Sequence, residues 1–190
     1  MALLVAIAIL FGIWNRNTIP FIHKPKTFVD PHPLHSDLNL TMSHIVHSPQ
    51  TLRITLTNLH PSTSLTLLSW GTPLDPDGIE SGVFQITERS SATKILRAGS
   101  RIRHRVPPKR DAFIELEPRH AVTKDIMLEG PRVSLEKGKE YEVQARGLWK
   151  VVWHASVAHV GEKTLKLSAG ATGFMSWEYE SDVVTVKIRR

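Results

Sequence analysis

Ten histidines are the residues of this sequence best suited to bind a metal ion or to transfer a proton. Two pairs, His32 with His35 and His44 with His47, are each spaced three residues apart. On a strand, that spacing turns two side chains toward opposite faces. Zinc peptidases need histidines four residues apart on a helix, with a glutamate beside the first, and no histidine here precedes a glutamate. We therefore expect no metal site and no cofactor.

Nucleophilic catalysis has equally little support in the sequence. There is no cysteine, which excludes a thiol nucleophile, structural disulfides and Cys-ligated zinc. The serines form no Gly-x-Ser-x-Gly motif. A Ser/His/Asp triad built from distant residues stays open, because triads are defined by geometry rather than by sequence order. We expect no catalytic residue and interpret the chain as non-enzymatic, with an enzyme of unrecognised type as the less favoured alternative.

A cluster of cations is the strongest candidate for a binding site. Arg101, Arg103 and Arg105 alternate with other residues, so a strand here would carry all three on one face, and Lys109 and Arg110 follow closely. The net charge of +6 favours an acidic partner, while no base-stacking motif supports nucleic acid. We predict that these five residues bind a protein partner with an acidic surface. A solvated strand face that resists aggregation is the more usual reason for such a pattern. A phospholipid headgroup and a polyanion are the other acidic partners that the cluster would suit.

Short strands are the elements that would position these residues. The run 52–57 alternates apolar and polar residues, the run 65–70 is apolar nearly throughout, and the turn-forming sequence 60–63 separates them. A period of two predicts a half-buried strand, and the continuous apolar run predicts a more buried one. We expect the two to pair as consecutive antiparallel strands, with Trp70 as the large core residue.

Runs of the same kind recur along the chain, separated by glycine and proline, and no helical period of adequate length follows Ile13. This pattern predicts an all-β fold, an antiparallel immunoglobulin-like β-sandwich. The further expected strands are 38–43, 83–87, 94–96, 101–106, 112–117, 122–128, 140–145, 148–154, 174–179 and 183–188.

Large apolar side chains on these strands predict the core. The expected core residues are Trp70, Leu56, Tyr141, Trp149 and Trp153. Trp149 and Trp153 lie four residues apart, which places both rings on one face of a regular strand. Core packing against Trp70 is the favoured interpretation. A platform that stacks on sugar rings is the alternative, and it requires both rings to be exposed.

The first 36 residues differ in composition from the rest. Residues 1–17 open with thirteen apolar residues, fewer than the roughly 20 that span a bilayer, and predict a signal peptide or a short membrane anchor. A misplaced start or a buried segment is the alternative. Residues 18–36 carry four prolines and predict a linker before a sandwich domain at 37–190. The expected location is extracellular, or membrane-anchored, with the membrane contacted only through an uncleaved N-terminal segment.

A possible modification site lies at the start of the predicted domain. Asn39-Leu40-Thr41 matches the acceptor sequence for N-glycosylation. Glycosylation requires passage through the secretory pathway, so Asn39 is a candidate only for a secreted chain.

Several short motifs, in order along the chain, resemble the N-terminal propeptide-type domain of fungal deuterolysin-like metallopeptidases. The resemblance covers about residues 38 to 153 and includes a strand followed by the turn Trp70-Gly71-Thr72-Pro73-Leu74. A basic strand at 101–106, the segment 111–118 and the strand Gly138 to Val143 come later. Each of these motifs is short.

The sequence departs from that family because it contains no His-Glu-x-x-His helix. The resemblance therefore implies a free-standing relative of the accessory domain without its protease. On this interpretation the chain is a non-catalytic module, secreted or membrane-tethered, that binds a metallopeptidase and assists or restrains its folding or activity. A carbohydrate- or surface-binding module is the alternative.

Overall fold

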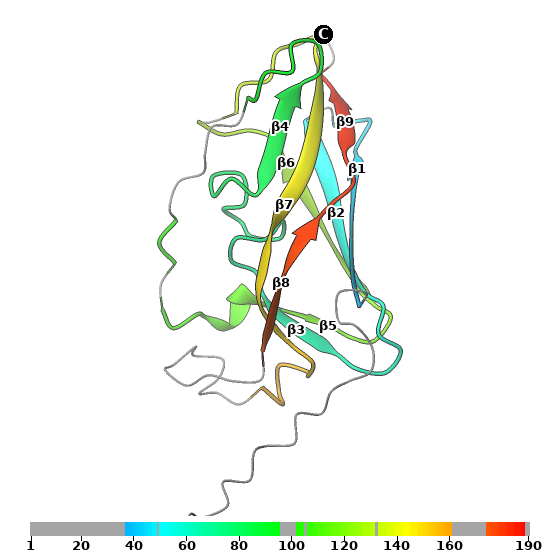
Figure 1. The fold of residues 1–190 in the computed structure, drawn as a ribbon, viewed down its shortest axis with the longest axis vertical. Helices are drawn as coiled ribbons and strands as arrows, with labels where there is room; N and C mark the ends of the chain where they lie inside the picture. Colours follow the sequence, from blue (N-terminus) through cyan, green and yellow to red (C-terminus); the bar gives the residue numbers. More distant parts are fainter. Residues whose placement is uncertain are drawn as a thin grey trace, which may run out of the picture. The chain divides into compact units, whose positions relative to one another are not determined.

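A computed structural model describes residues 37–48, 50–95, 102–104, 106–131, 133–160 and 174–188. These residues form nine strands, β1 to β9, and their helical content is limited to the 3-10 turn η2 (Arg110–Ala112) (Figure 1). All the strand pairs among them are antiparallel. The predicted all-β sandwich is thus confirmed. The predicted leader at 1–17 and linker at 18–36 lie outside the described residues.

One sheet has three strands, in the order β1 (Leu38–His44), β2 (Thr51–Asn58) and β6 (Ala121–Met127). Its central strand follows the expected alternation. Leu52, Ile54 and Leu56 are fully buried, whereas Arg53 lies on the outer face. Period-two burial of this kind gives the sheet one core face and one solvent face.

The other sheet is built around the long strand β7 (Glu140–Trp153). The first half of β7 pairs with β4 on one side and β9 on the other, and its second half pairs with β8 and β3. β5 continues the sheet beyond β3. The bounds of these strands are β3 (Leu65–Leu68), β4 (Phe84–Glu88), β5 (Phe113–Leu116), β8 (Met175–Glu180) and β9 (Val184–Lys187).

The expected pairing of β2 with β3 is wrong, because the two strands belong to different sheets. The connection between them crosses from one sheet to the other and is held by the buried side chain of Asn58. Its amide nitrogen donates to the carbonyl oxygens of Thr63, at 2.9 Å, and Leu116, at 3.0 Å. Its amide oxygen accepts from the backbone N–H of His60 at 2.9 Å. These bonds satisfy the polar groups of a buried crossing, so both strands can face one core.

Three further expectations about strands are corrected. The segments 140–145 and 148–154 belong to one strand, β7, because β8 pairs with it from Arg146 to Trp149, across the expected break at 146–147. Of the run 94–96, the described residues 94 and 95 form no strand, and Lys94 makes an isolated bridge with Thr87. Residues 102–104 of the predicted strand 101–106 are not in a strand, although Ile102 and His104 are more buried than Arg103 between them.

The core has a large and a small apolar cluster. Leu56, Tyr141 and Trp149 are buried in the large one. Trp153 is buried in the small one, against which the partly buried Trp70 packs. A regular strand would place Trp149 and Trp153 on the same face. Because they pack in different clusters, the two β7 tryptophans do not share a face. A register shift between Trp149 and Val152 is the physical reason, since an irregularity there changes which side chains face each cluster.

Candidate functional site

The sheet has a gap on one side of β7. β4 pairs with β7 as far as Ala145, and β3 pairs with it only from Val152. Between these two points no strand of the described chain lies beside β7 on that side, although β8 covers the other side. Within the described chain, the middle of β7 therefore has no strand partner on that side.

Hydrogen bonds at the start of the gap show which backbone groups face it. The N–H of Arg146 donates to the Val83 carbonyl, on the β4 side, at 3.1 Å. The N–H of Ser181 donates to the Ala145 carbonyl from the β8 side, at 2.9 Å. Backbone groups of successive strand residues point to alternate sides. The N–H and C=O of Leu148 therefore face the gap, as those of Arg146 do.

A groove of about 580 Å³ occupies this gap, and we call it the cationic groove. Three of the residues that line it are cations, Arg103, Arg146 and Lys150, and none is acidic. Arg146 forms an exposed ion pair with Glu180 at 3.4 Å. Within the described parts of the chain, neither of the other two cations has an ion pair. The full lining is Gly71, Ser81, Gly82, Val83, Ile102, Arg103, His104, Arg146, Gly147, Leu148 and Lys150.

A stacked pair of rings holds one wall of the cationic groove. The His104 ring lies parallel to Trp70, with 4.5 Å between ring centroids and 5° between planes. Its Nε2 is 3.5 Å from the Oδ2 of Asp75, which is buried. The same carboxylate accepts the N–H of Gly71 at 2.6 Å and that of Asp77 at 3.0 Å. These contacts anchor residues 102–104 to the loop after β3 and present Arg103 at the groove.

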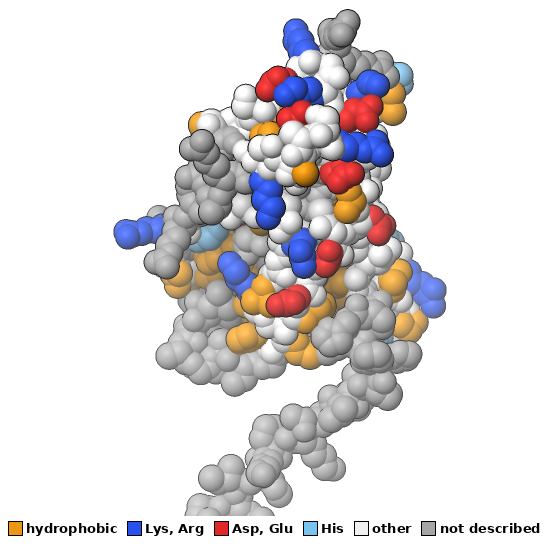
Figure 2. All heavy atoms as spheres, turned by 45° about the horizontal axis from the view of Figure 1, so that its top comes forward, with side chains coloured by type: hydrophobic (Ala, Val, Ile, Leu, Met, Phe, Trp, Pro, Cys, Tyr) orange, Lys and Arg blue, Asp and Glu red, His pale blue; other side chains and the backbone are white. Residues whose placement is uncertain are grey.

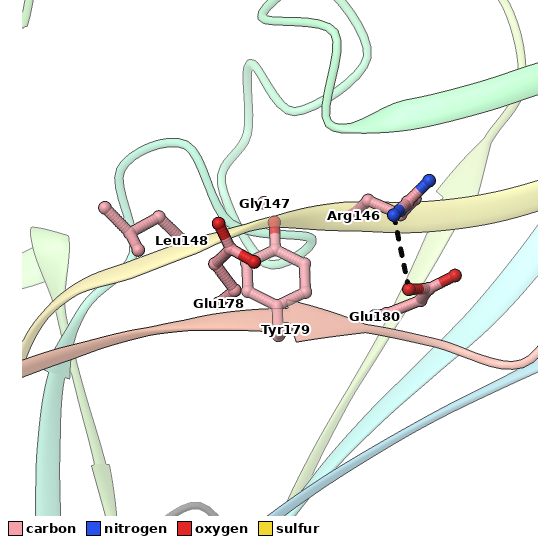
Figure 3. A pocket seen from close by; sticks show the side chains of 6 residues that line it. All are labelled: Arg146, Gly147, Leu148, Glu178, Tyr179 and Glu180. Carbon is pink, nitrogen blue, oxygen red and sulfur yellow. Dashed lines mark ion pairs between the residues drawn. The ribbon is translucent and has the colours of Figure 1, made fainter.

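Tyr179, on β8, reaches across β7 beside the groove. Its ring extends from β8 toward Gly147 on β7, where Figure 3 shows a second hollow beside Arg146 and Glu180. The hydroxyl donates to the carbonyl of Gly71 at 3.3 Å, so the ring links β8 to the loop beyond β7. Burial raises the pKa of Tyr179 well above its usual range, with the nearby Asp75 adding to the effect, so the hydroxyl stays a neutral donor.

The Tyr179 side chain can cross β7 at Gly147 because glycine has no side chain. A Cβ at that position would lie 2.6 Å from the Tyr179 hydroxyl and 2.9 Å from the ring carbon that carries it. Gly71 also lines the groove, near the flexible end of a lysine side chain. A Cβ there would lie 2.9 Å from the Nζ of Lys150, and the residue also has a φ of +69°, which favours glycine.

The cation cluster predicted from the sequence is only partly found at this groove. Arg103 lines it, whereas the exposed Lys109 and Arg110 lie at η2, outside its lining. Arg101 and Arg105 lie outside the described residues. Arg146 and Lys150 were missed. Their alternation with Gly147, Trp149 and Val151 is visible in the sequence, and it is the signal that would have identified an outward cationic face on β7.

Among the described residues, Trp149, Trp153 and the histidines offer no competing site. Trp149 is 2% exposed and Trp153 is 4% exposed, so neither ring is available to stack on a sugar. In the described residues, no group of three or more potential ligands could hold a metal ion. None of the helical structure in that same part of the chain is long and apolar enough to cross a membrane.

Two comparisons place the chain among known proteins. A family model described as an immunoglobulin-like domain matches residues 37–188. An "Uncharacterized secreted protein" of Arthroderma benhamiae is 30% identical over 139 residues, which cover 73% of this chain and 69% of the relative. Neither description mentions a metallopeptidase or a propeptide, so that resemblance stays a prediction. The family match spans most of the sequence, and the chain therefore belongs to the immunoglobulin-like domain family.

Proposed function

We propose that this chain is a non-catalytic, secreted immunoglobulin-like module that binds an acidic segment of a partner protein in the cationic groove. The observation that carries the proposal is the stretch of β7 that has no strand partner within the described chain, beside Arg103 and Lys150, which have no ion pair there. Buried tryptophans next to an open strand edge favour protein binding over carbohydrate binding, because stacking on sugars would require exposed rings.

The proposed ligand is an extended peptide with carboxylates. The Leu148 N–H and C=O face the groove, so a bound segment in strand conformation can complete the backbone hydrogen bonding of β7. Arg103 and Lys150 would then face carboxylates of the same segment. Cations at the rim of an interface chiefly raise the association rate and select against basic partners, so binding should weaken as salt is added.

Secretion is proposed on two independent grounds. The similar protein of Arthroderma benhamiae carries the word "secreted" in its name, and residues 1–13 of this chain form an uninterrupted apolar run. The resemblance to deuterolysin-like propeptide domains adds a finer proposal. The acidic segment would belong to a secreted metallopeptidase, whose folding or activity the module assists or restrains.

Fluorescence anisotropy tests the groove directly. The probe is a labelled peptide that alternates glutamate with threonine, and a peptide that alternates glutamine with threonine is its control. We expect the purified chain to bind the first peptide at low ionic strength. The double variant Arg103→Gln, Lys150→Gln should bind it about tenfold more weakly, a loss equivalent to about 1.4 kcal/mol.

The matched control variant is Lys109→Gln, Arg110→Gln, which removes the same charge from exposed positions outside the groove. It should change the affinity by less than about threefold, the scale expected for a change in net charge alone. Equal losses in the two double variants would show that attraction to net charge, and not the groove, holds the peptide. Equal binding of both peptides would contradict an acidic ligand.

A further inference from the structure

We infer that Asn39 carries an N-linked glycan, and that this glycan protects the edge of β1 opposite β2. The inference rests on the proposed secretion, since the modification occurs in the secretory pathway. It concerns the three-stranded sheet and is independent of the cationic groove. Asn39 is the only asparagine in the sequence that is followed two residues later by serine or threonine.

β1 presents the whole acceptor sequence on its outer face. Leu38 and Met42 are buried and fix the inner face of the strand, so Asn39 and Thr41 point outward and are both exposed. Leu40, between them, is partly buried against the core. The asparagine side chain that would be modified is therefore accessible in the folded chain, and a glycan there would displace no core residue.

The side chains next to Asn39 on the sheet surface are short and mostly polar. The strand register places Thr57 beside Asn39 and Ala121 beside Thr57, so one row across the sheet has only short side chains. The next row consists of Thr41, Thr55 and Thr123. In this row the hydroxyls of Thr55 and Thr123 are 3.2 Å apart. The first sugar rings can lie across these rows and hydrogen-bond to hydroxyls without meeting a bulky group.

The charges on this face do not compete with a sugar for space. Arg53 and Asp125 are cross-strand neighbours and form two hydrogen bonds, at 2.8 and 2.9 Å. Each satisfies the other, and both lie on the outer face with the threonine rows. The face is therefore hydrophilic and internally satisfied, which suits a covering glycan better than it suits a protein partner.

The edge of β1 opposite β2 indicates what a glycan at Asn39 would do. In the described part of the chain, β1 pairs with β2 alone, so no other described strand is hydrogen-bonded along its opposite edge. Natural edge strands are usually protected by lysine, other charges or proline. The sequence of β1, LNLTMSH, contains none of these. A branched hydrophilic glycan at Asn39 would sterically prevent a strand of a second molecule from pairing along this edge.

The test expresses the full chain in yeast behind a heterologous signal peptide, so that delivery does not depend on its own leader. Mobility before and after endoglycosidase H treatment is measured in both medium and cell lysate. We expect one sensitive glycan on the wild type and on Thr41→Ser, which keeps the acceptor sequence. Asn39→Gln and Thr41→Ala should lack it. A wild-type chain without a glycan would overturn the inference.

Two comparisons test secretion, glycosylation and edge protection separately. If the chain's own leader fails to deliver it while the heterologous signal succeeds, the proposed secretion fails and the acceptor site stands. Edge protection is tested by light scattering on the same polypeptide before and after enzymatic deglycosylation. We expect the deglycosylated chain to self-associate at several-fold lower concentration. Identical association curves would show that the glycan does not protect the edge.

Discussion

The outer face of the three-stranded sheet and the cationic groove beside β7 differ in whether their charged side chains form ion pairs. On the sheet, Arg53 lies directly across from Asp125 in the strand register and the two side chains are joined by two hydrogen bonds. In the groove, Arg103 and Lys150 have no ion pair among the described residues. The difference follows from the strands. Where a strand lies opposite, register supplies a partner for each charge, and where the neighbouring strands end, cations stay available to a ligand.

The end of the molecule formed by β4, β7 and β9 follows the first pattern. Glu140 is paired with Lys187 in the register, and their side chains are 3.1 Å apart. Arg89 reaches Glu140 at 3.3 Å. Figure 2 shows acidic and basic side chains intermixed on the face it presents. Intermixed charges of both signs keep a surface soluble without creating a field of one sign. The absence of acidic residues from the groove lining therefore stands out against a mixed surface.

The largest expected effect comes from the carboxylate that supports the groove. Asp75→Ala would leave the N–H groups of Gly71 and Asp77 without their acceptor and remove the partner of His104. Buried donors without partners cost about 1–3 kcal/mol each, so we expect a loss of about 2–4 kcal/mol in urea unfolding. Asp77→Ala is the matched control, because its side chain is exposed, and should cost less than about 0.5 kcal/mol. Equal losses would show that Asp75 does not hold the groove wall.

Gly147→Ala should have the next largest effect, because the new Cβ would overlap the Tyr179 hydroxyl and ring. Overpacking of this kind costs about 1–3 kcal/mol, again measured by urea unfolding. Tyr179→Phe removes the nearest atom, at 2.6 Å, but leaves the ring carbon at 2.9 Å. The double variant should therefore lose less stability than the sum of the single variants. Simple additivity would contradict a crossing of the ring over Gly147.

The fold could largely be predicted from the sequence because strand identity is a local property. Alternation and turn residues located nearly all of the strands to within a few residues. Which sheet a strand joins is not local. β2 and β3 were predicted to pair because they are consecutive, yet the hydrogen bonds of Asn58 to Thr63 and Leu116 carry the connection across the core. A single asparagine in sequence gives no sign of that role.

The candidate site was harder to predict because it depends on where strands end. Alternation at 101–106 predicted a strand with an arginine face, but residues 102–104 are held by the stack of His104 on Trp70 and not by a strand. Arg146 and Lys150 alternate just as clearly, yet their importance depends on the gap between Ala145 and Val152. The register shift on β7 likewise separates Trp149 from Trp153 without any mark in the sequence.

A smaller effect on stability should distinguish Arg53, which has an ion pair, from Arg103 and Lys150, which have none among the described residues. Arg53→Gln removes one member of a satisfied pair, so thermal unfolding should show a modest loss of stability at low salt that shrinks as salt screens the pair. The groove variant Arg103→Gln, Lys150→Gln should show no loss, since these cations contribute little to the folded state. A groove variant destabilised as much as Arg53→Gln would mean that its cations have structural partners after all.

The smallest expected effect is a dependence of stability on pH, and it comes from the pair of Arg53 and Asp125. The hydrogen bonds from Arg53 hold the pKa of Asp125 below its usual range. A lowered folded-state pKa means that the unfolded chain binds the proton more readily. The stabilisation from Asp125 is therefore present above its unfolded pKa, near 4, and is lost as pH falls through the folded value. Urea unfolding of the wild type and Arg53→Gln should differ at pH 6 and converge as the pH falls below the folded-state pKa of Asp125. A difference that persists at low pH would show that Arg53 stabilises the sheet by packing and not through the carboxylate.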